Sequence, residues 1–309
     1  MRFWRLAVWC GSVAALAGSL CAQHPQTPML PVEAEVRGLA ELPSTPCGMP
    51  SQLDWFDDDT PSGPANHAGW YTAESAGGWL VGGELTYLAP FTQQGVSSDS
   101  PRFHLEPGLR LWFGYDWPDC WSVELRYWRW SEQANAIVTL AGNTLDSKIS
   151  AQAADLEFGH EFPFRRWSLK VGGGVRLGVL DSTLTDTQYA SQPFDKACFT
   201  GVGPTLFVDG RKPLTSELAA IAKIRYSLLL GTIQHDLAFG RAGSGDRREA
   251  FLDTLDLQLG GEWFRPCNAG GRWFVRLVFE AQVWHASGLN TLHSDLALVG
   301  PSLSIGIDR

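Results

Sequence analysis

Residues 272–284 read Arg-Trp-Phe-Val-Arg-Leu-Val-Phe-Glu-Ala-Gln-Val-Trp, and one set of alternate positions in this stretch is entirely apolar. Successive side chains of an extended strand point to opposite faces, so the two sets separate in space. A charge-free apolar face backed by a charged one is typical of a strand with lipid on one side and a polar interior on the other. The apolar set is Trp273, Val275, Leu277, Phe279, Ala281 and Val283, and the opposite set includes Arg276, Glu280 and Gln282.

The same alternation recurs along the chain. Residues 251–263 set Leu255, Leu257 and Leu259 against Asp256 and Gln258. Alternation bounded by turn-forming residues predicts strands, and a tilted membrane crossing needs roughly 9–11 residues. The predicted strands are residues 79–88, 105–115, 121–130, 151–162, 167–179, 199–208, 215–228, 251–263, 272–284 and 296–308.

The connections between these segments alternate between long and short. Bacterial outer-membrane barrels turn tightly on the periplasmic side and loop freely outside, whereas a soluble sandwich has no reason to sort its connections in this way. The long connections are residues 89–104, 131–150, 180–198, 229–250 and 285–295, and the short ones, each with a proline, are residues 116–120, 163–166, 209–214 and 264–271.

We therefore predict an all-β fold, a transmembrane antiparallel up-and-down β-barrel of about ten strands with both termini on the periplasmic side. Two other strand counts stay open. Eight strands would follow if residues 199–208, which contain Pro204 and several glycines, are not a strand. Twelve would follow if residues 229–241 contain another hairpin.

Three regions follow one another along the chain. Residues 1–22 combine two arginines with the short apolar run from Leu6 to Leu20, which predicts a cleaved signal peptide and export through the periplasm. Leu20 before Cys21 disfavours a lipoprotein. Residues 23–78 are rich in proline and predict a largely disordered periplasmic linker. Residues 79–309 would form the barrel.

Composition narrows the function classes. The formal net charge is −9 and no basic stripe is present, which disfavours nucleic acid as a partner. The most apolar run, residues 218–230, is interrupted by Lys223 and Arg225, so a helical membrane protein is excluded. The chain contains 14 Trp, a content that suits a β protein with aromatic belts at membrane interfaces.

Aromatic residues gather where the predicted strands begin or end, as in the interfacial girdles of membrane barrels. A soluble sandwich, for example a secreted carbohydrate-binding protein, also buries aromatic rings and stays the alternative. The predicted interfacial residues are Trp79, Tyr87, Phe113, Tyr115, Trp121, Trp167, Trp263, Trp273 and Trp284.

The inner face of the predicted barrel carries acids and bases in nearly equal numbers. Unpaired charges in a narrow interior are costly, so we expect a network of pairs between strands. Ten strands enclose less space than an open porin, so we expect small or absent conductance. The predicted lumen-lining charges are Glu84, Arg110, Glu124, Arg126, Asp155, Glu157, Lys170, Arg176, Lys223, Arg225, Asp256, Arg276 and Glu280.

Four cysteines lie outside the predicted leader: Cys47, Cys120, Cys198 and Cys267. They lack the paired spacing of zinc sites, so we expect no structural metal and no cofactor. Cys47, Cys120 and Cys267 would all lie on the periplasmic side. Both a disulfide and unpaired thiols stay open.

Three runs resemble those of a known family, because they are strand-like and contain glycines and aromatic residues: Trp79 to Phe91, Glu106 to Tyr115 and Glu124 to Trp128. Together with residues 174–178, they resemble the Legionella-type pore-forming outer-membrane-protein family, found in planctomycete-like bacteria. The resemblance covers residues 79–309 and implies an outer-membrane pore-forming barrel without catalytic residues. The chain departs from one common barrel feature, because its last strand ends in Asp308 and Arg309 and not in an aromatic residue.

An outer-membrane hydrolase is the rival class, since small barrels can carry a catalytic Ser and His near the outer rim. The candidates are His235, and His285 and His293 beside Ser287 and Ser294. No nucleophile elbow or metalloprotease motif accompanies them. We therefore expect no enzyme.

The expected partners are outer-membrane lipid and, during biogenesis, the barrel-assembly machinery. The loop at residues 240–249 offers Arg241, Arg247 and Arg248 to an anion such as lipopolysaccharide phosphate, although a solvated loop tip is the commoner meaning of such a composition. The proline-rich segment would contact cell-wall material if it binds anything. The sequence thus predicts a narrow pore or a structural envelope barrel, with charges that set ion preference or seal the lumen.

Overall fold

The computed structural model describes residues 77–92, 104–137, 144–164, 167–186, 193–237, 246–267, 271–287 and 295–309. The predicted signal peptide and nearly all of the proline-rich segment lie outside these ranges. Within them, no helix is long and apolar enough to cross a membrane. The strands are β1 (Gly78–Thr92), β2 (Glu106–Asp116), β3 (Trp121–Ile137), β4 (Thr144–Phe164), β5 (Trp167–Asp186), β6 (Pro193–Pro213), β7 (Leu218–Leu237), β8 (Asp246–Pro266), β9 (Arg272–Ser287) and β10 (Asp295–Asp308).

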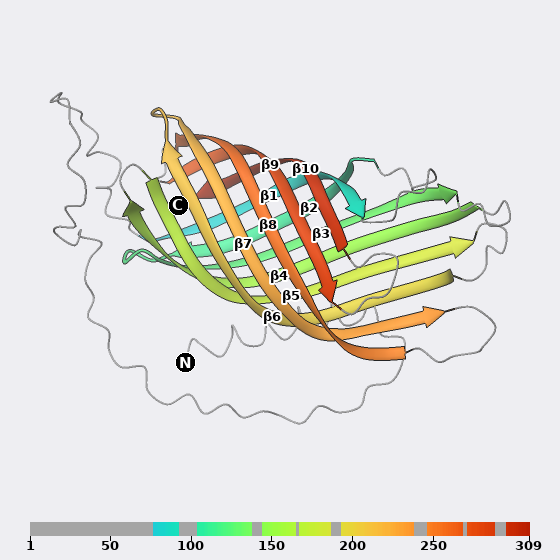
Figure 1. Ribbon diagram of the computed structural model, residues 1–309. Coiled ribbons are helices and arrows are strands. Elements are labelled where there is room, and N and C mark those ends of the chain that lie inside the picture. Colours follow the sequence, from blue (N-terminus) through green and yellow to red (C-terminus); the bar gives the residue numbers. More distant parts are fainter. Residues whose placement is uncertain are drawn as a thin grey trace, which may run out of the picture. The chain divides into compact units, whose positions relative to one another are not determined.

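The ten strands form one closed antiparallel barrel (Figure 1). Each strand pairs with its neighbours in the sequence, and β1 closes the sheet by pairing with β10, where Leu80 lies opposite Asp308. The predicted all-β, ten-stranded, up-and-down barrel is confirmed. Residues 199–208 belong to the continuous strand β6 and residues 229–237 continue β7, so the eight-strand and twelve-strand alternatives are wrong.

The barrel has two distinct ends. The strand ends that are joined by short connections lie at the end where β1 begins and β10 stops, which we call the turn end. The backbone N–H of Arg309 donates to the carbonyl of Trp79 there, at 2.9 Å. The strand ends that are joined by longer connections lie at the opposite end, which we call the loop end.

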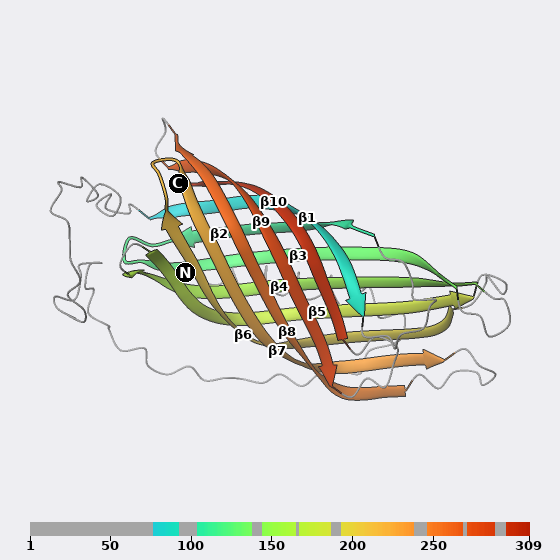
Figure 2. The same cartoon turned by 45° about the horizontal axis from the view of Figure 1, so that its top comes forward.

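At the turn end the predicted strand boundaries lie within three residues of the observed ones, except that β6 continues to Pro213, and at the loop end most of them fall short. Strands β4, β6 and β8 are each 21 residues long, and each starts several residues before its predicted position. On the loop side, β3 to β8 extend well past β1, β2, β9 and β10 (Figures 1 and 2). About half of such a strand suffices to cross a bilayer, so each of these strands is longer than one membrane crossing requires.

The two faces of β3 exchange their character along the strand. Near the turn end the outer face is apolar and the inner face is polar, whereas toward the loop end the outer face is polar and the inner face is aromatic. From the turn end, the outer residues are Trp121, Val123, Leu125, Tyr127, Arg129, Ser131 and Gln133, and the inner residues are Ser122, Glu124, Arg126, Trp128, Trp130 and Glu132.

The outer faces of other strands also change from apolar to polar, at a similar height along the barrel. Toward the loop end, the outer face of β4 passes from Ala154 to Gln152, and that of β7 passes from Leu230 to Thr232. The sheet register places Tyr127 of β3 opposite Ala154 of β4. The barrel is therefore membrane-like near the turn end and resembles a soluble barrel with an apolar core near the loop end. Because strand prediction followed the apolar outer stripe, it stopped at this change.

Candidate functional site: the barrel interior

All of the predicted lumen-lining charges lie on the inner face of the barrel. Glu124, Lys170, Lys223 and Arg276 keep roughly a fifth of their side chains exposed. The buried members are Glu84, Arg110, Arg126, Asp155, Glu157, Arg176, Arg225, Asp256 and Glu280.

Arg110 joins three strands in the middle of the barrel. It lies on β2 and forms ion pairs with Glu84 on β1 and Glu280 on β9. Glu280 also accepts hydrogen bonds from the Gln282 amide at 2.6 Å and from the Ser302 hydroxyl at 2.8 Å. Every oxygen of this fully buried carboxylate is therefore bonded, which is the condition under which a buried charge is tolerated.

Arg176 forms a second centre. From β5, its Nε donates to Asp155 Oδ1 on the adjacent strand β4 at 2.6 Å. Its Nη2 reaches Asp256 Oδ2 on β8 at 2.8 Å, and its Nη1 reaches Thr254 Oγ1 at 2.8 Å. Since β5 and β8 are not neighbours in the sheet, this guanidinium spans part of the lumen.

Glu157 on β4 is the hub of a third centre. Arg225 of β7 donates to both of its oxygens, and the Nη2 to Oε2 distance is 3.0 Å. Arg126 of β3 lies 3.7 Å from Glu157 Oε2 and 3.5 Å from Glu124 Oε1. The ion pairs of the three centres together connect β1, β2, β3, β4, β5, β7, β8 and β9 in one ionic layer across the interior.

Further charges lie at the turn end that the sequence did not single out. Glu262 of β8 accepts from Arg211 Nε of β6 at 2.7 Å and from Arg276 Nε of β9 at 2.6 Å. Lys223 lies 3.5 Å from Asp209. Asp209, Arg211, Lys223 and Arg276 border a polar cavity of about 120 Å³. Strand parity identifies Arg211, Asp209 and Glu262 as inner residues as directly as it identified Lys223 and Arg276.

A large apolar cluster fills the interior on the loop side of the ionic layer. Among the described residues, every strand except β2 contributes to it, and most of its members are almost completely buried. The members are Leu88, Trp128, Trp130, Ile149, Ala151, Ala153, Leu180, Phe199, Leu229, Ile233, Ala250, Leu252, Trp284, Leu296 and Leu298. Their parity also points inward, although only charged residues were predicted to line the lumen.

Gly108 explains how β2 accommodates this cluster. A Cβ atom at this position would lie 2.5 Å from Thr86 Oγ1, 3.0 Å from the Arg129 carbonyl oxygen and 3.2 Å from Trp130 Cβ. Only a residue without a side chain therefore leaves room for Trp130 beside β2.

Trp284 is one prediction that the structure overturns. It was expected at a membrane interface, but only 1% of it is exposed and its ring stacks on Trp128 inside the barrel, with centroids 5.9 Å apart. Its Nε1 donates to Gln282 Oε1 at 3.1 Å. Position 284 has the same parity as Glu280 and Gln282, so its place at the end of the predicted strand was misleading.

The other predicted interfacial aromatics lie on the outer face. Trp79, Phe113, Trp121 and Tyr87 are exposed. Rings cluster near the turn end, where the Trp263 and Trp273 centroids are 4.7 Å apart. The remaining members, Tyr115 and Trp167, are partly exposed.

The ionic layer and the apolar cluster meet without much free space. A cavity of about 10 Å³ lies between them, lined by residues that include Arg110, Arg126, Asp256 and Trp284. That volume is close to the minimum for a single water molecule.

The cysteines and histidines do not assemble a reactive site in the described ranges. Cys120 and Cys198 each take part in a disulfide, but lie too far apart along the barrel to pair with each other. Cys267 is free, and Cys47 lies outside these ranges. His285 of β9 pairs with Asp295 of β10, and His235 lies on β7. His293, Ser294 and Arg241 lie outside the described residues, and Arg247 and Arg248 begin β8. Among the described side chains, no group of three or more His, Cys, Asp or Glu residues is suited to hold a metal ion.

Comparison with known proteins gives one family match. Residues 73–307 match the family model described as Legionella pneumophila major outer membrane protein precursor. No curated protein matches the chain. The matched residues span all ten strands almost completely.

Several solved structures share a distant likeness. A major outer membrane protein from Thermus thermophilus is 12% identical over 76% of this chain and 100% of its own, with a TM-score of 0.36. The beta domain of the Bordetella autotransporter Brka is 13% identical over 76% and 99%, with a TM-score of 0.39. OprG from Pseudomonas aeruginosa is 12% identical over 74% and 95%, with a TM-score of 0.31. At such scores the likeness carries no argument about function.

Proposed function

Since the family match covers the whole barrel, this chain belongs to the Legionella pneumophila major outer membrane protein family, and we propose that it is an envelope barrel whose lumen is sealed at rest. The protein is an outer-membrane β-barrel. Its turn end then faces the periplasm and its loop end faces outward, as in bacterial barrels generally. Export by the predicted signal peptide is part of the same proposal.

The observation that carries this proposal is the apolar cluster on the loop side of the lumen. Its residues come from opposite sides of the barrel, so they meet across the interior and do not merely line a wall. Trp128 of β3 and Trp284 of β9 are an example, because β1, β2 and β10 separate their strands in the sheet. An ion crossing this layer would lose its hydration without finding polar partners.

The ionic layer supports the same function. Its guanidinium groups are bonded to carboxylates on several strands and are not left facing an aqueous channel. A ten-stranded barrel is close to the size at which side chains fill the interior. We therefore favour a structural role in the envelope over a permanently open narrow pore.

The alternative of a hydrolase is less favoured. It needs a histidine close to a nucleophile, and the two described candidates lie on different strands, His235 on β7 and His285 on β9, with β8 between them. His285 instead pairs with Asp295.

Planar-bilayer recording of the refolded mature protein tests the seal. We expect a silent bilayer from the wild type and discrete openings from a Trp128→Ala/Trp284→Ala variant, because removal of the two stacked rings opens the loop-side cluster. A Trp121→Ala/Trp263→Ala variant, which removes two rings from the outer face, is the matched control and should stay silent. Heat-modifiable gel mobility establishes that each barrel is folded.

Discrete wild-type openings would contradict the seal. If their ion selectivity also changed in an Arg110→Ala/Arg126→Ala variant, the protein would be a narrow pore lined by the ionic layer.

A further inference from the structure

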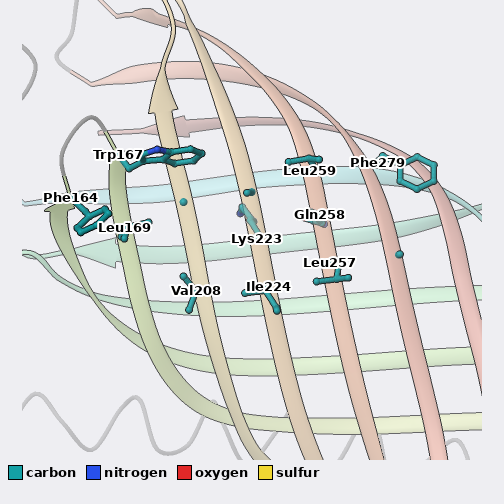
Figure 3. Close-up of a pocket in the computed structure, with 13 residues that line it drawn as sticks. Phe164, Trp167, Leu169, Val208, Lys223, Ile224, Leu257, Gln258, Leu259 and Phe279 are labelled. Carbon is teal, nitrogen blue, oxygen red and sulfur yellow. The ribbon is translucent and has the colours of Figure 1, made fainter. Parts of the chain in front are cut away.

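The outer face of the barrel has a hollow of about 680 Å³. Figure 3 shows Phe164 and Trp167 along one flank and Phe279 along the opposite flank. The floor is low because Gly210, Ala222 and Ala281 have little or no side chain. In the sheet register, Gly210 lies opposite Ala222, and Ala222 lies opposite Leu259. The volume is within the roughly 300–1,000 Å³ range of small-molecule sites.

The hollow lies in the membrane-like part of the barrel. It begins near the turn-end residues Phe164 and Trp167 and reaches Leu257. From Leu257 toward the loop end, the first polar residue on the outer face of β8 is Asp253, so Leu257 still belongs to the apolar part of that face. Almost all of its outward-facing surface is aliphatic or aromatic. In a bilayer the hydrophobic effect contributes little to the binding of a ligand by such a surface. The affinity for a ligand comes from close van der Waals packing, which an empty hollow lacks.

A cation marks the turn-end mouth of the hollow. The Nζ of Lys212 lies 5.7 Å from the ring centroid of Trp167. Among the described residues, no carboxylate forms an ion pair with Lys212. Arg265 is a useful contrast, because it also lies over a tryptophan, Trp263, but is paired with Glu217 at 3.4 Å. Lys212 thus offers a positive charge at a membrane interface beside an apolar hollow.

We propose that this hollow binds one anionic glycerophospholipid from the periplasmic leaflet, with an acyl chain over Gly210 and Ala222 and its phosphate at Lys212. The apolar floor and flanks match a hydrocarbon chain. The mouth places the ammonium group at the depth where a headgroup phosphate begins, beside an interfacial tryptophan.

A second copy of the chain fits the hollow less well. In a two-fold dimer within a membrane the same patch faces itself, so a hollow would meet a hollow and leave a gap. The two Lys212 side chains would also approach each other at the same depth. Shape and charge therefore both favour a lipid.

Native mass spectrometry of the full-length purified barrel tests this site, with dioleoyl phosphatidylglycerol and dioleoyl phosphatidylcholine as the probes. Ala222→Trp fills the hollow and should lower bound phosphatidylglycerol about tenfold. Its matched control is Ala154→Trp, which enlarges another outer-face alanine on β4 and should retain lipid like the wild type. Ala281→Leu is a second, gentler filling variant and should act in the same direction as Ala222→Trp.

Headgroup recognition is measured separately. Lys212→Gln should lower the preference for phosphatidylglycerol over phosphatidylcholine about fivefold, as expected for one basic residue at a membrane surface. Arg265→Gln, the control at the same end, should leave that preference unchanged. Heat-modifiable mobility of each variant again establishes folding.

Two results would overturn the site. Equal lipid retention by folded Ala222→Trp and Ala154→Trp barrels would mean that lipid binds without using the hollow. A wild-type dimer that becomes a monomer in Ala222→Trp, with lipid retention unchanged, would assign the hollow to a second copy. Neither result depends on conductance, so the lipid site and the sealed lumen are tested independently of each other.

Discussion

Replacement of Arg110 by methionine tests whether the ionic layer is dry. The side chain of Arg110 is 5% exposed and its partners Glu84 and Glu280 are 7% and 0% exposed. Methionine keeps much of the unbranched stem but removes the guanidinium group. Two carboxylates are then left facing each other without the cation between them.

The expected cost follows from the burial of these partners. Removing one member of a buried ion pair typically costs about 3–5 kcal/mol, whereas exposed pairs contribute about 0–1 kcal/mol. Glu280 keeps its hydrogen bonds from Gln282 and Ser302, which compensate part of the lost interaction. We therefore expect Arg110→Met to lower the free energy of unfolding by about 3 kcal/mol. Neutralising the acids as well, in Arg110→Met/Glu84→Gln/Glu280→Gln, should restore most of that loss.

Urea unfolding of the barrel in liposomes measures these differences. The matched control is Arg265→Met, because Arg265 and Glu217 are 54% and 47% exposed and form a comparable pair at the surface. This control should cost less than about 1 kcal/mol. If Arg110→Met cost no more than the control, water would reach the ionic layer and the argument for a dry lumen would be wrong.

Two further substitutions test the packing and the membrane boundary. Gly108→Ala places a Cβ atom 2.5 Å from Thr86 Oγ1 and should lower the free energy of unfolding by about 1–3 kcal/mol. In the control Gly83→Ala the nearest atom lies 3.3 Å from the new Cβ atom, so the loss should be distinctly smaller. Equal urea midpoints for the two variants would contradict the tight fit at Gly108. Leu259→Arg inserts a charge into the outer apolar stripe and should lower the free energy of unfolding in liposomes by about 2–4 kcal/mol. Gln234→Arg lies on the loop side of the change of face on β7 and should leave that free energy nearly unchanged. A similar loss for both variants would show that the membrane boundary does not lie at the change of face.

Much of this architecture could be predicted from strand parity. The two-residue period assigns each side chain to one face, so a correct register at one position fixes the whole strand. The inner placement of Arg110, Arg176 and Glu280 follows from that period alone. The short connections followed from turn-forming residues such as Pro118 and Pro213, because tight turns have strict backbone requirements.

The partners of these charges could not be predicted in the same way. That Arg176 reaches Asp256 on β8 depends on how strands distant in the sequence face each other across the lumen, which local alternation does not encode. The lengths of β4, β6 and β8 were underestimated for a different reason. Their outer faces become polar near the loop end, so a search for an apolar outer stripe loses the strand while its alternation continues. Trp284 was misplaced for another reason: its place at the end of the predicted strand suggested a membrane interface, whereas its parity is that of Glu280 and Gln282.

The near balance of acids and bases is consistent with the apolar cluster above them. A water-filled pore tolerates unpaired charges, because solvent and counterions screen them. Beneath a layer formed by Trp128, Trp284 and their neighbours, an unpaired charge would have no such compensation, so each guanidinium needs its carboxylates in place. If the lumen is sealed as we propose, the cluster also strengthens each pair by excluding water. The two layers would then be interdependent: the charges stay paired because the cluster keeps water out, and the cluster closes across the barrel because the ion pairs beneath it hold the strands in register.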